Sequence, residues 1–285
     1  MLPQMANKPS IAIVGPGKLG MALALALRER GYRIEAVIGP PGKTSMRAKR
    51  LAKQVRSRAL REPKDIHAEI LWLCVPDAEI ARAAKNLAPI FRGRFAFHSS
   101  GALSSDELTI LRGSGTPVAS VHPLMTFVEG ANPPLEGVSF AIEGDIAAVR
   151  AARVIVRDLG GESYTIDKAT KNAYHAWGTF ASPLLTALLA TAEHVAGLAR
   201  VKGKTARHRM LPILRQTVEN YGKSGAGPGF SGPIVRGDLE TIRRHLAILR
   251  RSPVPEYVYL ALARAALEYL PSKKRKAIER LLNFA

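Results

Sequence analysis

Cysteine is almost absent from this chain, since Cys74 is the single example among 285 residues. One thiol cannot close an intramolecular disulfide, which excludes a disulfide framework and favours a reducing compartment. The opening residues MLPQMANKPS also lack an apolar core of signal-peptide length. Together these absences predict a cytoplasmic protein.

Acidic residues are scarce as well: 23 Asp and Glu stand against 42 Lys and Arg, which gives a formal net charge of +19. Such an excess suggests an anionic partner, such as a phosphorylated ligand, a nucleic acid or a membrane surface. Hydrophobic residues make up 47% of the chain and charged residues 23%, which excludes disorder and allows a sizeable core. The length predicts about two domains.

The one uncharged run long enough to cross a membrane is residues 172–192, which contain no Asp, Glu, Lys or Arg. Asn, His, Ser, Pro and three threonines interrupt it, whereas membrane spans are more uniformly apolar. We therefore predict a buried helix and no membrane association. The run is too apolar to face water, so we expect a second copy of the chain to cover it in a homodimer.

Strand-like and helix-like segments alternate along the first part of the chain. Short runs of apolar and β-favouring residues predict strands at 10–14, 33–38, 70–75, 95–98, 118–121, 139–142 and 162–166. Apolar spacing predicts a helix over 46–59, and Asp77 and Asp145 are placed to cap helices. This alternation predicts a parallel sheet with helices on both faces.

Beyond Asp167 the pattern becomes almost entirely helical. A long helix is expected over 168–198 with a bend at Pro183, and a glycine-rich break at 222–233 precedes three more helical segments. We therefore expect an α/β domain over residues 1–166 and an all-helical domain over 167–285.

The sequence GPGKLG at 15–20 matches G-x-G-x-x-G between the first strand and the first helix. Gly15 permits a tight turn, Gly17 lets the backbone approach a pyrophosphate, and Gly20 lets helix and strand pack closely. The helix N-terminus then offers free N–H groups to the phosphates. This pattern predicts a doubly wound Rossmann domain that binds a dinucleotide. The expected cofactor contacts here are Gly15, Gly17, Lys18, Leu19, Gly20, Val75 and Pro76.

The end of the second strand selects the cofactor. An acidic residue there would bond the ribose 2′-hydroxyl of NAD, but the strand ends in Gly39 and no acid follows until Glu62. Lys43, Ser45 and Arg47 come next and suit the 2′-phosphate of NADP. We interpret the further basic residues from Lys49 onward as a solvated helix face.

Polar clusters follow two later strands, HSSGA at 98–102 and HPLMTF at 122–127. Ligands of open α/β sheets bind at the carboxyl ends of strands. A lone histidine is more often structural, but the pairing favours a site that contains His122 with Ser99 or Ser100.

Lys171 and His175 are one helical turn apart and share a face. Reduction of C=O or C=N by hydride requires a proton donor, and either side chain can serve. The alternative is a surface lysine beside a buried polar histidine. Farther along, Arg236 suits bidentate binding of a substrate carboxylate, and Asp238 could orient it. The alternative for Asp238 is a helix cap.

Six motifs together, GPGKLG, VPDAEI, HSSGAL, HPLMTF, KNAYHAW and GPIVRGD, resemble a known group. These are uncharacterised Rossmann-like dehydrogenases whose second domain is labelled a domain of unknown function. They are relatives of pyrroline-5-carboxylate reductase and of the 6-phosphogluconate dehydrogenase superfamily. The resemblance implies nucleotide binding at the GPGKLG glycines and a helical, 6-phosphogluconate-dehydrogenase-like C-terminal domain used for dimerisation.

Two single residues gain a role from related families. His122 is similarly placed to a prephenate dehydrogenase histidine that meets the substrate hydroxyl, and Lys171 to the catalytic lysine of β-hydroxyacid dehydrogenases. The chain departs from the pattern at Ala181-Ser182-Pro183, where relatives usually carry an asparagine in place of the proline. This departure argues against a direct transfer of the lysine–asparagine mechanism.

The sequence therefore predicts an NADP-dependent oxidoreductase that binds a small carboxylate with a hydroxyl, carbonyl or imine between its domains. It predicts no metal site. A non-catalytic protein that senses NADP(H) is the alternative. Nucleic-acid binding is a third possibility, but no recognised motif accompanies the positive charge.

Overall fold

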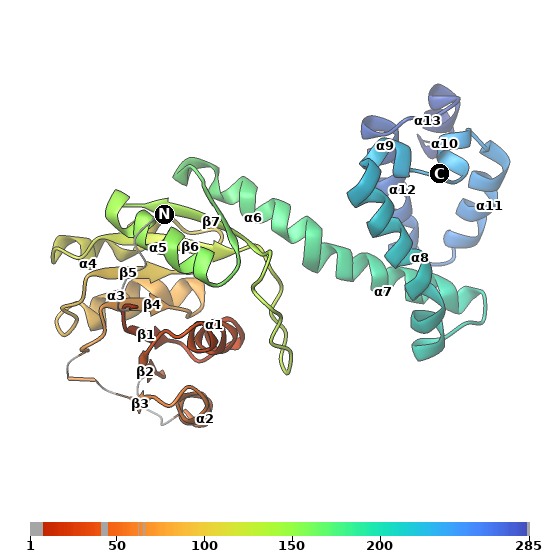
Figure 1. The fold of residues 1–285 in the computed structure, drawn as a ribbon. Helices are drawn as coiled ribbons and strands as arrows, with labels where there is room; N and C mark the ends of the chain where they lie inside the picture. Colours follow the sequence, from red (N-terminus) through yellow and green to blue (C-terminus); the bar gives the residue numbers. More distant parts are fainter. Residues whose placement is uncertain (1–7, 41–44, 62, 65, 284–285) are drawn as a thin grey trace. The chain divides into compact units, whose positions relative to one another are not determined.

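The computed structural model describes residues 8–40, 45–61, 63–64 and 66–283. Two compact units divide the chain between Thr179 and Phe180. The first contains a sheet in the order β3-β2-β1-β4-β5-β6-β7-β8 (Figure 1). The strands are β1 Ile11–Val14, β2 Ile34–Ile38, β3 Arg58–Leu60, β4 Ile70–Leu73, β5 Phe95–His98, β6 Val118–Pro123, β7 Ser139–Gly144 and β8 Glu162–Thr165.

The strand order confirms the predicted doubly wound fold. The chain moves outward from β1 to β3 and then crosses back to β4 on the other side of β1. A ligand-binding crevice lies at such a switch point in open α/β sheets. Neighbouring strands are parallel except β6 and β7, which are antiparallel. The connection between them, residues 124–138, contains no helix, and a parallel return normally needs one.

Helices cover both faces of the sheet. They are α1 Lys18–Glu29, α2 Met46–Gln54 and α5 Ile146–Asp158 on one face, and α3 Ile80–Leu87 and α4 Thr109–Gly113 on the other. The last helix of the first unit is α6 Lys171–Thr179. Alternate residues of β1 enter opposite cores: Ile11 and Ile13 pack on the side of α1, α2 and α5, and Ala12 and Val14 on the side of α3 and α4. The two-residue period of a strand produces this division. It explains why the central strands are continuous apolar runs.

The expected helix over 46–59 is wrong at its end. Helix α2 stops at Gln54, and Arg58–Leu60 forms the edge strand β3, parallel to β2. Arg56 has φ +53°, a left-handed conformation that ends the helix and turns the chain back to the sheet. Residues 58–59 are exposed, so this strand carries no apolar signal.

The two expected aspartate caps are confirmed only in part. Asp145 is the N-cap residue of α5, but its side chain makes no cap hydrogen bond, because its carboxylate accepts from the Val118 N–H at 2.8 Å and from Arg112 Nε at 3.1 Å. Asp77 lies inside a 3-10 turn, Asp77–Glu79, whose N-cap is Pro76. Both side chains hold neighbouring loops in place.

The second unit is helical, as predicted. It contains α7 Leu185–Leu198, α8 Gly203–Ser224, α9 Ala226–Gly229, α10 Pro233–Arg236, α11 Leu239–Leu249, α12 Pro253–Tyr269 and α13 Arg275–Asn283. At Pro183, where a bend was expected, the helix contains a π-helical turn, Phe180–Leu184. A core of its own joins α11, α12 and α13. By contrast, α7 buries none of its residues and α8 buries only Ala206.

No single helix in the described ranges is long and apolar enough to cross a membrane. Lys168–Leu198 and Gly203–Ser224 meet the criteria of length and composition only as a pair, bent by 116°.

Candidate active site

The GPGKLG loop joins β1 to α1, and two of its glycines are required by the fold. Gly15 has φ +96°, and a Cβ there would lie 2.6 Å from the Cys74 carbonyl oxygen. A Cβ on Gly20 would overlap the Gly15 carbonyl oxygen. Gly17 differs, because a Cβ would meet nothing within 4 Å. The open space at Gly17 is where a bound group can approach the backbone.

The N-terminus of α1 fits an anion. Gly17 is the N-cap and supplies no side-chain hydrogen bond, and the first turn contains no acid. The N–H groups of Lys18 and Leu19 stand in that first turn, where the helix dipole favours negative charge. Lys18 is exposed and adds a positive charge. This end of the helix has the geometry that holds a pyrophosphate.

Val75 and Pro76 lie beside this loop. They follow β4, which pairs with β1, and the Val75 side chain lies 2.9 Å from the Cβ position of Gly15. Val75 is half-buried and Pro76 is exposed. The structure therefore brings together two segments that the sequence predicts to contact the cofactor.

The segment after β2, where the sequence predicts contacts with the 2′-phosphate, contains an ion pair that the sequence did not reveal. Ser45 caps α2, since its Oγ accepts a hydrogen bond from the Ala48 N–H at 3.3 Å. The Arg47 guanidinium pairs with Glu129 at 2.8 Å, and both side chains are largely exposed. Glu129 stands on the 124–138 connection, 82 residues away, so no local pattern points to it. Lys43, the third expected phosphate contact, lies outside the described residues.

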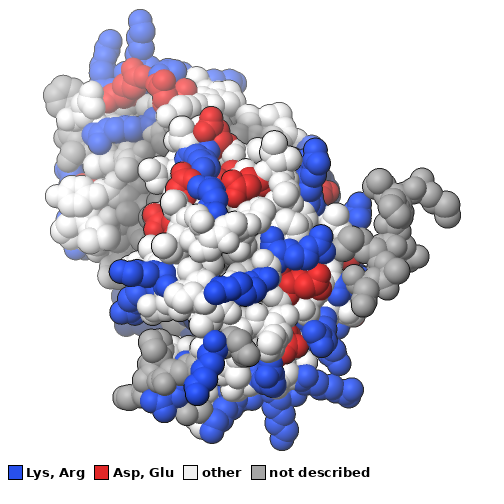
Figure 2. All heavy atoms as spheres, turned by 90° about the vertical axis from the view of Figure 1, so that its left-hand side faces the viewer, with Lys and Arg blue, Asp and Glu red and all other residues white. Residues whose placement is uncertain are grey.

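The remaining basic residues of α2 face solvent, as expected. Figure 2 shows Lys and Arg side chains crowded at the level where α2 and β3 lie in Figure 1. Lys49, Arg50 and Lys53 are all exposed.

The loop after β5 is held by its own polar groups. His98 is buried, its Nε2 donates to the Ser104 carbonyl at 2.9 Å, and its Nδ1 accepts from the Ser100 N–H at 3.1 Å. Burial lowers the pKa of His98 to about 4, although the Ser104 carbonyl favours the protonated ring. His98 is therefore a neutral structural residue.

The two serines of this loop have internal partners. Ser99 Oγ accepts from Trp72 Nε1 at 2.9 Å. Ser100 Oγ donates to Asp77 at 2.9 Å and accepts from the Leu103 N–H at 2.9 Å. Both hydroxyls stabilise the loop in this state of the protein.

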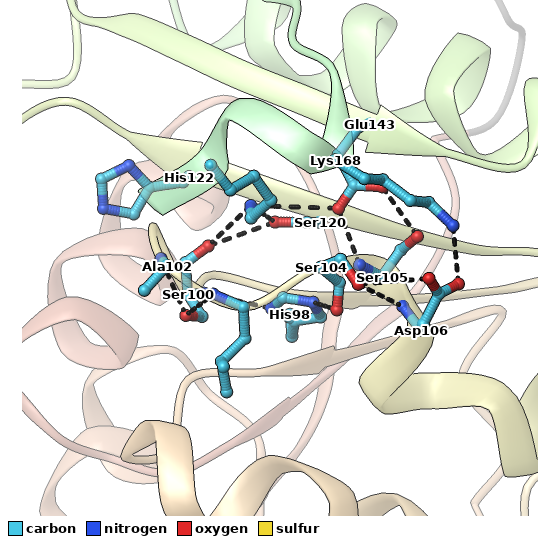
Figure 3. Close-up of polar contacts among 12 residues, drawn as sticks. His98, Ser100, Ala102, Ser104, Ser105, Asp106, Ser120, His122, Glu143 and Lys168 are labelled. Atoms are coloured by element: carbon cyan, nitrogen blue, oxygen red, sulfur yellow. Dashed lines mark hydrogen bonds and ion pairs between the residues drawn. The ribbon is translucent and has the colours of Figure 1, made fainter. Parts of the chain in front are cut away.

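Lys171 is the most deeply buried of the proposed catalytic groups, with 1% of its surface exposed. Its Nζ donates to Ser120 Oγ at 2.7 Å and to the Ser100 carbonyl at 3.2 Å, and Glu143 lies 3.9 Å away. Burial lowers the pKa of Lys171, while Glu143 opposes that shift. In Figure 3 the carbonyl oxygen of Ser100 faces the Ser120 hydroxyl, while the Ser100 side chain points the other way.

Glu143 completes this network on its far side. Its carboxylate accepts from the N–H of Ser105 at 2.7 Å and from the Ser105 hydroxyl at 2.8 Å (Figure 3). Sequence reasoning missed Glu143 and Ser120. The available signal was one carboxylate, Glu143, and one hydroxyl, Ser120, within the mainly apolar strands β7 and β6.

The histidines His122 and His175 meet above the same loop. A Cβ on Gly101 would lie 2.8 Å from His122 Nε2 and 2.9 Å from His175 Cδ2. The centroids of the two imidazole rings are 6.5 Å apart. His175 is exposed and His122 is half-buried. Burial, with the nearby Lys171 charge second, lowers the pKa of His122 to about 4. The first unit thus brings both histidines to the end of the sheet beyond β5 and β6.

The last two expected site residues belong to the second unit. Asp238 caps α11, because its carboxylate accepts from the Thr241 N–H at 3.1 Å and the Thr241 hydroxyl at 2.7 Å. These bonds lower the pKa of Asp238. Arg236 is exposed at the end of α10. Their role in substrate binding stays a prediction.

Two family descriptions match separate parts of the chain. Residues 4–123 match a Rossmann-like domain, and residues 138–266 match the domain of unknown function DUF2520. No curated protein is significantly similar to the chain.

Three solved structures share both parts of the fold. One is a Bacteroides fragilis protein named provisionally as an NADP oxidoreductase (TM-score 0.76, 20% identity, 90% of this chain, 97% of that one). Another is a Thermotoga maritima protein (TM-score 0.68, 23% identity, 90% of this chain, 97% of that one). The third is Plasmodium falciparum pyrroline carboxylate reductase with NADP bound (TM-score 0.60, 16% identity, 94% of this chain, 97% of that one). At these identities the likeness shows the fold.

Proposed function

We propose that this chain, a Rossmann-like domain followed by a DUF2520 domain, is an NADP-dependent oxidoreductase. Its substrate is a small carboxylate that carries a hydroxyl, carbonyl or imine. The observation that carries the proposal is the open space at Gly17 beside the N-terminus of α1, where no side chain caps the helix. The histidines His122 and His175 support it, since their ring centroids are 6.5 Å apart and both rings lie beside Gly101.

The residues present fit NADP. Gly15, Gly17 and Gly20 with the first turn of α1 would hold the pyrophosphate, and Ser45 and Arg47 would hold the 2′-phosphate. No acid follows β2 in the sequence until Glu62, so Glu129, the ion-pair partner of Arg47, is the carboxylate that the phosphate would displace. Two of the three solved structures carry NADP in their names. Bound there, NADPH supplies a hydride to an electrophilic carbon.

The chain itself must supply the proton that completes a reduction. Of the pair Lys171 and His175, only His175 is exposed, and the Lys171 ammonium is engaged by Ser120 and the Ser100 carbonyl. This favours His175 as the proton donor and Lys171 as a support for the loop after β5. His122 stands where it can hold the reacting oxygen.

The second unit supports a homodimer. Apolar side chains remain exposed along it, including Phe180 at 72%, Ile213 at 67% and Val218 at 64%. Patches of this kind on a monomer mark interaction sites. A cytoplasmic location agrees with the single thiol.

A sensor of NADP(H) without turnover is the second candidate. It is favoured by the internal hydrogen bonds that engage Ser99, Ser100 and Lys171.

Titration with NADPH, followed by screening of small keto acids, hydroxy acids and cyclic imines for a change in reduced-nicotinamide absorbance, separates the two. Turnover with any of them supports the oxidoreductase. Tight NADPH binding without turnover across the panel supports the sensor, and a protein that binds no NADPH contradicts both.

A further inference from the structure

The hydroxyl of Tyr174 lies 2.6 Å from Nδ1 of His122. The two residues come from α6 and β6, and their rings meet edge to face with centroids 5.4 Å apart and planes at 88°. Tyr174 is 7% exposed. A short hydrogen bond in a buried setting holds the imidazole in one orientation.

The direction of this bond follows from the chemistry of the two groups. A phenol O–H is a better donor than a neutral imidazole N–H, and an imidazole nitrogen is a better acceptor than a phenol oxygen. Burial, and after it the nearby Tyr164 hydroxyl, raises the pKa of Tyr174, so that the Tyr174 hydroxyl keeps its proton. The lowered pKa of His122 makes the ring neutral near pH 7. A neutral imidazole that accepts at Nδ1 carries its proton on Nε2.

The other ring nitrogen of His122 lies over Gly101. A Cβ at this position would approach Nε2 within 2.8 Å, so a side chain larger than hydrogen would displace the ring. Within residues 66–283, Nε2 makes no hydrogen bond in the protein, in contrast to both nitrogens of His98. The N–H of His122 is therefore available to a bound molecule.

We propose that Tyr174 is a positioning residue that fixes His122 as its Nε2–H tautomer, so that His122 presents a hydrogen-bond donor above Gly101. This deepens the proposed function and rests on it for the identity of the acceptor. An N–H donor pairs with an oxygen that accepts, such as a carbonyl, a hydroxyl or a carboxylate. A protonated imine is itself a donor and gains nothing at this point. The tautomer thus selects an oxygen of the substrate.

The chain contains a matched pair for comparison. His245 and Tyr259 in the second unit have the same arrangement, with Nδ1 and the hydroxyl 3.2 Å apart, ring centroids 5.9 Å apart and planes at 86°. His245 is exposed. A Tyr259→Phe variant therefore removes a comparable tyrosine hydroxyl from a histidine that is far from the proposed site in sequence.

The test is nitrogen-15 NMR of the imidazole rings in the full-length protein at neutral pH, with His122 assigned by the loss of its signals in His122→Gln. The unmodified protein should show a protonated Nε2 and a bare Nδ1 for His122. A protonated Nδ1 would overturn the proposal without any further variant.

Tyr174→Phe should convert His122 to a mixture of tautomers, whereas Tyr259→Phe should change His245 alone. His122 signals that stay the same in Tyr174→Phe would contradict the role of Tyr174. Failure of the proposed function has a different signature: a protein that binds no NADPH but keeps His122 as Nε2–H loses the oxidoreductase and retains the tautomer assignment.

Discussion

The ammonium group of Lys171 donates a hydrogen bond of 2.7 Å to the hydroxyl of Ser120, 51 residues earlier in the chain. The same ammonium reaches the Ser100 carbonyl, and Ser120 donates to that carbonyl as well, at 3.2 Å. Two donors therefore hold one carbonyl of the loop after β5. Since Gly101 follows Ser100 directly, this arrangement also fixes the backbone against which the rings of His122 and His175 lie.

The first prediction concerns this buried cation. Lys171→Met leaves the Glu143 carboxylate buried without its cationic neighbour, and loss of one partner of a buried pair costs about 3–5 kcal/mol. We expect a lower urea midpoint by roughly that free energy of unfolding. Glu143→Gln in the same background should recover part of the loss.

Turnover distinguishes a supporting lysine from a proton donor. If Lys171→Met keeps full stability but loses on the order of 10²- to 10⁴-fold in turnover, the lysine donates the proton after all. His175→Ala, at an exposed position, should lose turnover on that scale without a change in unfolding.

A second prediction separates two glycines of the nucleotide loop. Gly17→Ala adds a Cβ that meets nothing in the protein, so the unfolding free energy should change little while NADPH affinity falls, because the methyl group stands where the pyrophosphate approaches. Gly20→Ala, whose Cβ meets the Gly15 carbonyl oxygen, should be destabilised. Thermal unfolding and NADPH titration measure both effects. Unchanged NADPH affinity in Gly17→Ala would contradict pyrophosphate binding at Gly17.

The third prediction concerns cofactor choice. Arg47→Ala should weaken NADPH binding about tenfold or more and leave NADH unaffected, since a charge-assisted phosphate contact contributes about 1.5–3 kcal/mol. Glu129→Gln should act in the opposite direction, because it removes the carboxylate that competes for Arg47. Dissociation constants for both nucleotides test the pair. Equal affinities for NADPH and NADH in the unmodified protein would contradict the assignment to NADP.

The fourth prediction is a homodimer built through the second unit. Sedimentation at micromolar concentration should give about twice the 30.8 kDa chain mass. Phe180→Lys should shift the protein toward the monomer. Ile146→Lys in α5 is the control, because Ile146 has the same 72% exposure in the first unit and should leave the dimer intact. A 30.8 kDa species in the unmodified protein would speak against the dimer.

Local patterns determined much of this protein. The apolar runs of the central strands and the spacing of GPGKLG predicted the doubly wound sheet and its phosphate loop, because burial on both faces and a tight glycine turn act within a few residues. The resemblance drawn from the six motifs is confirmed by the Rossmann-like and DUF2520 matches. The edge strand β3 escaped prediction because it is only three residues long and two of them, Arg58 and Ala59, are exposed.

Only the tertiary structure decided how the polar side chains are used. The sequence marked His122 and Lys171 but could not supply Tyr174 for the one or Ser120 and Glu143 for the other. It also could not show that the Asp77 carboxylate accepts a hydrogen bond from the Ser100 hydroxyl and does not cap a helix. Each of these partners is at least 23 residues distant along the chain. Strand order and register bring them within hydrogen-bonding distance, and burial then fixes which group carries a proton or a charge.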